Sequence, residues 1–144
     1  MQLQPHFLFN AFNSIAMMAR QRHYKAVIGM INALSELLRM SLSIKDDQRV
    51  PLSVELELVQ KYLQVEQIRF RDRLKVQLDI PTTLGKYLVP SLVLQPIIEN
   101  AFQHGISKNE GDSLLRISVV AVGKELIIEV FNNGPLLNAR HEWF

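Results

Sequence analysis

The sequence contains no cysteine and no long apolar run. The absence of cysteine excludes disulfide bonds and thiolate chemistry, and it agrees with a reducing compartment. No apolar run approaches the roughly 20 residues that a helix needs to cross a bilayer. Internal repeats and low-complexity tracts are also missing from the 144 residues, which suffice for one ordinary domain or for a helical element joined to a small α+β unit.

An excess of charge is missing as well, because 16 basic and 14 acidic residues leave a formal net charge of +2. Basic residues are mixed with acids, as around Asp72, which is typical of a solvated helix face. No basic stripe with interleaved aromatic residues occurs, so direct binding of nucleic acid is not expected. Hydrophobic residues make up 48% of the chain and charged residues 21%, a composition typical of a folded globular protein.

Helical periodicity dominates the first part of the chain. Residues 6–19 form an amphipathic pattern, and residues 26–42 carry apolar side chains at helical spacing. A short basic turn joins them, which predicts an antiparallel helical hairpin. Its apolar stripes need more cover than one hairpin gives, so we expect pairing with a second copy into a four-helix bundle. We expect Phe7, Phe9 and Phe12 in the core of that bundle.

The second part of the chain mixes helical and strand periodicity, which predicts an α+β fold. A polar linker ending in a proline separates it from the hairpin. The expected elements, in chain order, are a helix capped by Ser53, a strand over residues 74–80, a helix over residues 90–104 closed by Gly105 as C-cap, and a hairpin of strands 114–122 and 125–131.

His6 stands at the start of the first expected helix, directly after Pro5. A lone histidine on a helix is most often structural or solvated. Metal binding is disfavoured, because no cysteine or carboxylate lies one helical turn away. A nucleophilic role requires a neutral, exposed imidazole, and Asn10, one turn on, is placed to orient the ring. The next residue is Phe7 and no acid stands beside His6, so the sequence does not predict a general base.

The stretch LVLQPIIENAFQHGI places Asn100 and His104 on one helical face. An asparagine amide oxygen suits Mg²⁺ that is already bound by phosphates, because this ion prefers oxygen ligands and keeps several waters. The neighbouring Glu99 could orient or deprotonate a water associated with the metal. The alternative interpretation is a polar helix end with capping residues.

Two further patterns have plain structural interpretations. Asn132 begins an Asn-Asn-Gly-Pro run after an expected strand, and such a run is most often only a turn. Glu66 and Arg69 are three residues apart on a helix, which predicts an exposed ion pair worth a few tenths of a kcal/mol.

Four motifs follow one another over nearly the whole chain: LQPHFLFNAFNSI, YLQVEQIRFRDRL, LVLQPIIENAFQHGI and the strand that runs into NNG. In this order they resemble the LytS-like family of sensor histidine kinases. The resemblance implies that His6 is the phosphoacceptor of a dimerisation helix and that Asn100 binds the Mg²⁺ of ATP. It also implies that Glu99, as a catalytic residue, and His104 lie near the nucleotide phosphates, within an α/β sandwich of the type shared by histidine kinases, gyrases and the Hsp90 chaperones.

The adenine-binding loop departs from the family pattern Asp-x-Gly-x-Gly. Asn132 stands at the aspartate position, Gly134 matches the first glycine, and Leu136 stands where the second glycine is expected. Asparagine still accepts a hydrogen bond from the adenine amino group but brings no negative charge, so weaker nucleotide binding is expected. The family's lid and second glycine-rich box are not found before Phe144, so we expect this chain alone to bind ATP poorly and to be inactive.

The expected domains are a dimerisation and phosphoacceptor region (1–50), a connecting helix (51–73) and the N-terminal part of an ATP-binding kinase domain, incomplete at its C-terminus (74–144). The resemblance implies a sensor histidine kinase of a two-component system that uses ATP and Mg²⁺ to phosphorylate His6. Its expected partners are a second copy and a response regulator, often of the LytTR type, whose aspartate receives the phosphoryl group. Segments upstream of Met1 would anchor this cytoplasmic portion at the bacterial inner membrane. The alternative is a non-catalytic dimerisation or docking module, a pseudokinase or truncated fragment that does not bind ATP productively.

Overall fold

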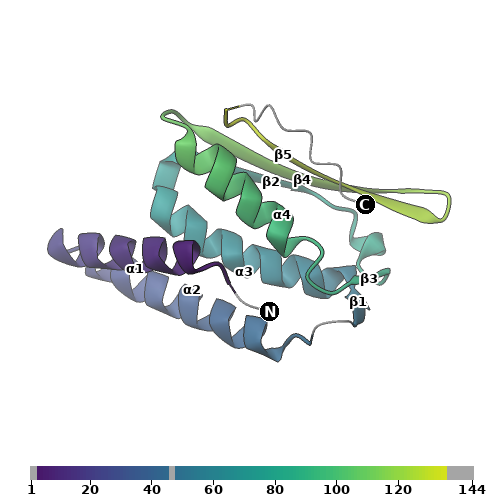
Figure 1. Cartoon of the computed structure of the whole chain (residues 1–144), viewed down its shortest axis with the longest axis horizontal. Coiled ribbons are helices and arrows are strands. Elements are labelled where there is room, and N and C mark those ends of the chain that lie inside the picture. Colours follow the sequence, from purple (N-terminus) through teal and green to yellow (C-terminus); the bar gives the residue numbers. More distant parts are fainter. Residues whose placement is uncertain (1–2, 46–47, 136–144) are drawn as a thin grey trace.

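The computed structural model describes residues 3–45 and 48–135 and has the α+β composition that the sequence predicts (Figure 1). Short 3₁₀ turns and one π-helical turn, Ala101–Gly105, connect the main elements. These elements are α1 (Pro5–Arg20), α2 (Tyr24–Ser43), β1 (Arg49–Pro51), α3 (Leu52–Phe70), β2 (Leu74–Asp79), β3 (Leu88–Pro90), α4 (Gln95–Asn100), β4 (Ser113–Val122) and β5 (Glu125–Asn132).

The main sheet has three strands in the order β2-β4-β5. Strands β2 and β4 run parallel, whereas β4 and β5 form the predicted antiparallel hairpin. Gly123 has a φ of +61° in its turn, a conformation that glycine adopts without steric cost. Strands β1 and β3 form a separate antiparallel pair.

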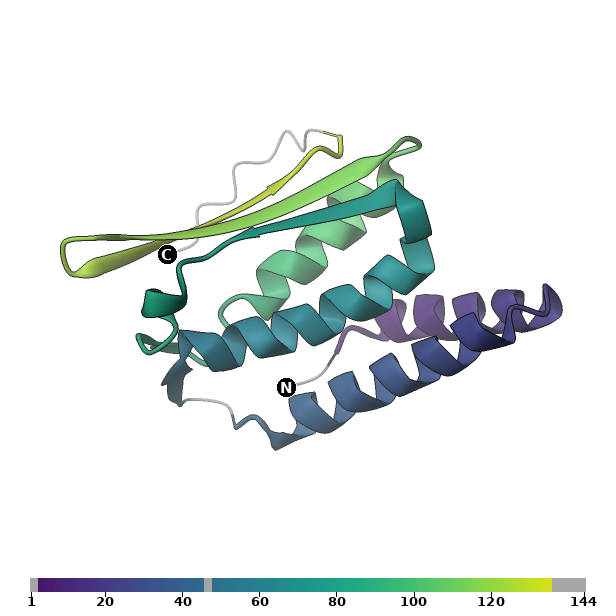
Figure 2. The ribbon, with the colours of Figure 1, turned by 180° about the vertical axis from the view of Figure 1, so that it is seen from behind.

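The molecule has three layers. The sheet forms one outer layer, α3 and α4 lie against its inner face, and the α1–α2 hairpin packs on the other side of α3 (Figure 1 and Figure 2). Alternate residues of β4, namely Leu115, Ile117 and Val119, point into the core between sheet and helices and are fully buried. Within the described residues, no helix combines the length and the hydropathy needed to span a membrane.

Two predicted helix boundaries are wrong. The helix α3 begins at Leu52, so Ser53 lies inside its first turn and does not cap it; Pro51 occupies the N-cap position. The helix predicted from residue 90 begins only at Gln95, because Pro90 belongs to β3 and a turn follows it.

A buried carboxylate from α3 explains the late start of α4. Glu55 is 1% exposed and accepts hydrogen bonds from the backbone N–H groups of Leu92 at 2.6 Å and of Leu94 at 3.4 Å. Leu92 has a φ of +63°, which is unfavourable for a side chain with a Cβ and needs such support. The contact joins segments far apart in the chain, so local sequence patterns do not reveal it.

Of the three phenylalanines near the start of α1, one is buried within the chain. Phe7 is buried, with its ring centroid 4.6 Å from that of Tyr62 in α3, and Tyr62 in turn lies 5.7 Å from Phe102. Phe9 and Phe12 are 67% and 54% exposed. The predicted packing of Phe9 and Phe12 in a bundle with a second copy stays a prediction, because within one chain α3 and the π-helical turn take Phe7 as the packing residue.

Candidate functional site

His6 lies exposed on the first turn of α1, with Pro5 at the start of that turn. Its Nδ1 is 3.2 Å from Nδ2 of Asn10, which is the orienting contact expected from the sequence. A rotation of the Asn10 amide by 180° places Oδ1 at the same position, where it accepts from a protonated Nδ1. In that arrangement the lone pair of His6 Nε2 is free, as nucleophilic attack requires.

The side of α1 that carries His6 and Asn10 also lines a small, partly open cavity of about 10 Å³, enough for about one water molecule. The helix α3 contributes Glu66 and the end of α4 contributes Glu99 to the same cavity. The expectation that no acid accompanies His6 is therefore wrong. Tertiary packing brings two carboxyl groups to a histidine that has none beside it in the sequence.

Glu66 is completely buried. Both its carboxylate oxygens accept from the same nitrogen, Arg69 Nη1, at 3.2 and 3.1 Å. The prediction of an exposed ion pair is wrong, because the side chain of Arg69 is only 17% exposed and that of Glu66 not at all. Burial raises the pKa of Glu66 to about 7, against the attraction of Arg69 and its hydrogen bonds, which lower it.

Glu99 is held by other partners. Its carboxylate accepts from Gln95 Nε2 at 3.1 Å and from the backbone N–H of Gln4, just before α1. Burial raises the pKa of Glu99 and these two hydrogen bonds oppose that effect. Gln95 Oε1 is buried without a hydrogen-bond partner among the described residues. Glu99 thus faces α1 and joins the helical hairpin to α4.

A second pocket, of about 270 Å³, opens between α4, the π-helical turn and the end of β5. It is lined by Asn100, Asn132 and Gly134, three of the residues expected to bind the nucleotide and its metal. His104, the fourth, is half-buried and does not line this pocket, and neither does Glu99. A π-helical turn changes which side chains share a helix face, and such turns are frequent at functional sites.

Two glycines bring the backbone segments of this pocket together. A Cβ on Gly134 would lie 2.5 Å from the carbonyl carbon and 2.6 Å from the Cα of Gly105, and a Cβ on Gly105 would collide with the side chain of Asn132. The predicted C-cap role of Gly105 is wrong, since it lies inside the π-helical turn with a φ of −112°. Both glycines are needed for close approach of the turn after β5 to the π-helical turn that follows α4.

The Asn-Asn-Gly turn is tied to its surroundings by both asparagines. Asn132 Oδ1 accepts from the backbone N–H of Gly134 at 3.0 Å. Asn133, which sequence reasoning did not single out, accepts from the N–H of Leu114 at 2.8 Å and donates to the carbonyl of Asp112 at 3.2 Å. Its place between Asn132 and Gly134 was the only signal available. Leu136 lies outside the described residues.

The donor set of this pocket fits a magnesium nucleotide in part. The amide oxygen of Asn100 is a neutral oxygen ligand of the kind that Mg²⁺ takes besides water and phosphate. Asn132 lines the same pocket, although its amide oxygen already accepts a hydrogen bond from the backbone N–H of Gly134. A volume of about 270 Å³ is near the lower limit of small-molecule sites.

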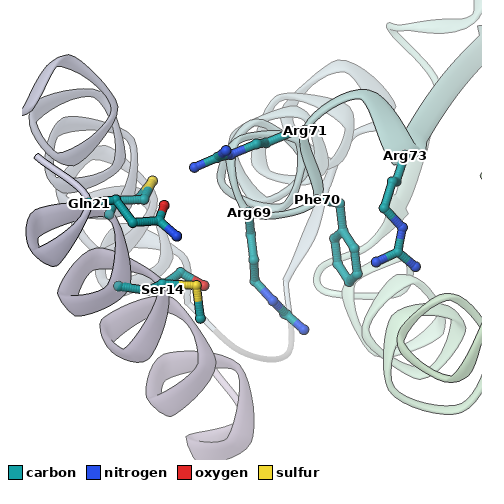
Figure 3. Close-up of a pocket in the computed structure, with 8 residues that line it drawn as sticks. Ser14, Gln21, Arg69, Phe70, Arg71 and Arg73 are labelled. Carbon is teal, nitrogen blue, oxygen red and sulfur yellow. The ribbon is translucent and has the colours of Figure 1, made fainter. Parts of the chain in front are cut away.

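A third pocket, of about 390 Å³, lies between α1 and the end of α3 (Figure 3). Ser14 of α1 and Gln21, directly after α1, line it on one side, and Arg69, Arg71 and Arg73 on the other. The predicted solvated face is confirmed for Arg71 and Arg73, which are exposed, and each of the three arginines also contacts a group of the chain. Arg69 contacts Glu66, Arg71 Nη2 lies 3.3 Å from Nδ1 of His23, and Arg73 donates to the carbonyl of Asn109 at 2.9 Å.

Comparison with known proteins adds independent evidence. The sequence model of the family described as histidine kinase matches residues 1–74. The sensor histidine kinase BtsS of Escherichia coli (strain K12) is 38% identical over 135 residues, 94% of this chain and 24% of BtsS. The sensor histidine kinase YesM of Bacillus subtilis (strain 168) is 34% identical over 139 residues, 96% of this chain and 24% of YesM.

The sensor protein LytS of Oceanobacillus iheyensis is 35% identical over 133 residues, which are 92% of this chain and 23% of that protein. The chain therefore spans about a quarter of the length of these relatives. The matches confirm the resemblance on which the sequence interpretation was based. With half of its length matched by the family and nearly all of it by LytS and other sensor kinases, the chain belongs to the histidine kinase family.

Proposed function

We propose that this chain is the phosphoacceptor region and part of the ATP-binding domain of a sensor histidine kinase in a two-component system. The supporting observation is an exposed imidazole, oriented by Asn10, in the same chain as a pocket lined by Asn100 and Asn132. His6 Nε2 attacks the γ-phosphorus of ATP, the bond to the bridging oxygen breaks, and ADP leaves with that electron pair. An aspartate of a response regulator then takes the phosphoryl group from His6.

The residues of the second pocket have distinct roles in this proposal. Asn100 holds the Mg²⁺ that accompanies ATP, and this ion, when bound, neutralises charge on the phosphates. Asn132 accepts from the adenine amino group, and Gly134 allows the backbone to approach the base closely. His104, set outside the pocket, contributes at most to its phosphate end. Glu99 keeps the hairpin on α4 through Gln4, so that the phosphoacceptor helix is held near the ATP-binding domain.

The fold assignment within this proposal is the sandwich of histidine kinases and Hsp90 chaperones. A mixed three-stranded sheet with α3 and α4 on one face supports it. The proposed division is 1–50 for the phosphoacceptor hairpin, 51–73 for the connecting helix and 74–144 for the ATP-binding part. The helix α3 contacts both α2 and the layer of α4 and the sheet, so it joins the two parts.

The proposed partners are a second copy of the chain and a response regulator. Large apolar side chains remain exposed on both helices of the hairpin, and a four-helix bundle with a second hairpin would cover them. They are Phe9, Phe12, Met17, Ile28, Ile31 and Leu42. The similarity to LytS favours a regulator of the LytTR type, and membrane attachment is assigned to segments upstream of Met1.

The test is phosphorylation of the full-length protein with radiolabelled ATP and Mg²⁺. We expect an acid-labile, base-stable label that is lost in His6→Gln and strongly reduced in Asn100→Asp. His23→Gln is the matched control, because His23 is another exposed histidine of the same hairpin, and it should keep the label. Retention of the acid-labile label by the His6→Gln protein would refute the proposal.

A non-catalytic docking module is the second candidate. It is favoured by the engagement of Asn132 Oδ1 with Gly134 and by the absence of a carboxylate at this position. Titration of a fluorescent ATP analogue separates the two functions: saturable binding that requires Mg²⁺ favours the kinase, and a flat titration of the full-length protein favours the docking module.

A further inference from the structure

We propose that Glu66 is the base that accepts the imidazole proton of His6 when this residue is phosphorylated. The inference rests on the proposed function and deepens it, because it assigns a reacting role to a residue of α3 that neither the sequence nor the pattern of the family motifs assigned. Glu66 acts through the single water molecule for which the shared cavity has room.

The geometry that supports this role is the cavity between α1, α3 and α4. His6 and Asn10 line it from α1, and Glu66 and Arg69 line it from α3. The volume, about 10 Å³, holds about one water molecule, and one water is the longest bridge over which a general base commonly acts. Solvent reaches His6, whereas Glu66 has no exposed surface. The carboxyl group therefore faces the cavity and not the bulk solvent.

A purely structural ion pair would be arranged differently. An arginine and a carboxylate usually form two parallel hydrogen bonds from two nitrogens, but here Nη1 of Arg69 alone serves both oxygens of Glu66. Lone pairs of the carboxylate thus remain available for a further donor. Burial of a carboxylate lowers the stability of the fold unless hydrogen bonds replace its lost hydration, and here a single nitrogen provides them. The position of such a group next to a reactive side chain points to function.

The electrostatic surroundings suit a base that works near neutral pH. Burial raises the pKa of Glu66 to about 7, and a base is most effective when its pKa lies near the working pH. The charged and titratable groups that face it are Arg69 and Tyr62 on α3, His6 on α1 and Glu99 on α4. Glu99 is not a second base, because Gln95 and the backbone of Gln4 already occupy its carboxylate.

The step balances as follows. The lone pair of His6 Nε2 forms the bond to phosphorus, the bond from phosphorus to the leaving group breaks, and the leaving group keeps the electron pair. The ring then carries a proton on Nδ1 and a positive charge. The Nδ1–H leaves Asn10 Oδ1 and donates to the water, through which the proton passes to the carboxylate of Glu66; this leaves a neutral phosphoimidazole ring and a protonated Glu66. Arg69, which contacts Glu66, is partly exposed and also lines the pocket of Figure 3, and the proton is finally released to bulk water.

The test uses phosphoramidate, a small phosphoryl donor whose leaving group is ammonia, on the full 144-residue chain. This donor does not need the nucleotide pocket, so a failure of ATP binding cannot be mistaken for a failure of Glu66. Digestion after Arg20 releases a peptide in which His6 is the sole histidine, and its mass reports the phosphorylation. Rates are compared at pH 8.5 for the wild type, Glu66→Gln, Glu66→Asp and the control Glu57→Gln, an exposed glutamate of the same helix.

We expect at least a tenfold slower reaction for Glu66→Gln, in line with the usual contribution of a general base. Glu66→Asp keeps the carboxyl group and should react at an intermediate rate, and Glu57→Gln should stay within about twofold of the wild type. Equal rates for the wild type and Glu66→Gln overturn the assignment.

Discussion

The burial of Glu66 leads to a quantitative prediction about stability, independent of any phosphorylation. Replacement of Glu66 by glutamine removes the titrating group and keeps a side chain of nearly the same shape. In the folded protein the pKa of Glu66 is raised from 4.5 to about 7, chiefly by burial. Because the folded state then holds this proton more tightly than the unfolded state, the wild type is favoured below pH 4.5 and loses stability as the pH rises towards 7.

The size of the effect follows from the change in pKa. At about 1.4 kcal/mol for each pH unit, the rise to about 7 corresponds to about 3 kcal/mol in full, of which about 2.5 kcal/mol falls between pH 5 and pH 8. The glutamine variant lacks this loss, and all other groups titrate alike in both proteins. The free energy of unfolding of the wild type relative to Glu66→Gln should therefore fall by about 2.5 kcal/mol between these two pH values.

Urea denaturation followed by circular dichroism at pH 5 and pH 8 measures this difference. Glu57→Gln serves as the control, because Glu57 is exposed on the same helix, and its difference from the wild type should stay the same at both pH values within about 0.5 kcal/mol. If the wild type and Glu66→Gln differ equally at pH 5 and pH 8, Glu66 titrates as an ordinary carboxyl group, and the reasoning from burial is wrong.

Two further predictions concern packing. Phe7→Ala should lower the free energy of unfolding by about 3 kcal/mol, because it empties a buried site beside the ring of Tyr62. Phe9→Ala, at an exposed position, should change the free energy of unfolding by less than about 0.5 kcal/mol in urea denaturation of the monomer. Equal losses for the two variants would contradict the observed orientation of α1. Gly134→Ala should lower the free energy of unfolding by about 2 kcal/mol in the same assay, because the new Cβ meets the backbone of Gly105 at 2.5 Å. Gly111→Ala is the control, because its Cβ points into open space. If the two variants are equally stable, the close contact at Gly134 relaxes and the prediction is wrong.

Most secondary structure could be predicted because its causes are local. The α1–α2 hairpin follows from helical spacing and a short turn, and the β4–β5 hairpin from two β-rich runs around Gly123. The start of α4 could not be predicted, because it depends on the carboxylate of Glu55 reaching the backbone of Leu92 from another helix. A hydrogen bond between segments distant in the chain has no periodic signature.

Part of the candidate site could likewise be predicted from the sequence, and part could not. The sequence motifs singled out His6, and helical spacing placed Asn10 one turn away, where the structure has it. They also pointed to Asn100 and Gly134, which meet in one pocket although an entire hairpin separates them. His104 was placed by regular α-helical spacing, and a π-helical turn moved it out of the pocket.

The sequence by itself determined the family, the phosphoacceptor candidate and the local elements, since each depends on residue types at short, regular spacing. Only the tertiary structure decided the surroundings of His6: the burial of Glu66, its raised pKa and the cavity that both residues line. The physical reason is that the environment of a side chain is set by elements that pack against it from elsewhere in the chain. The sequence predicted Glu66 in an exposed ion pair with Arg69, but in the folded protein its carboxyl group has no contact with solvent.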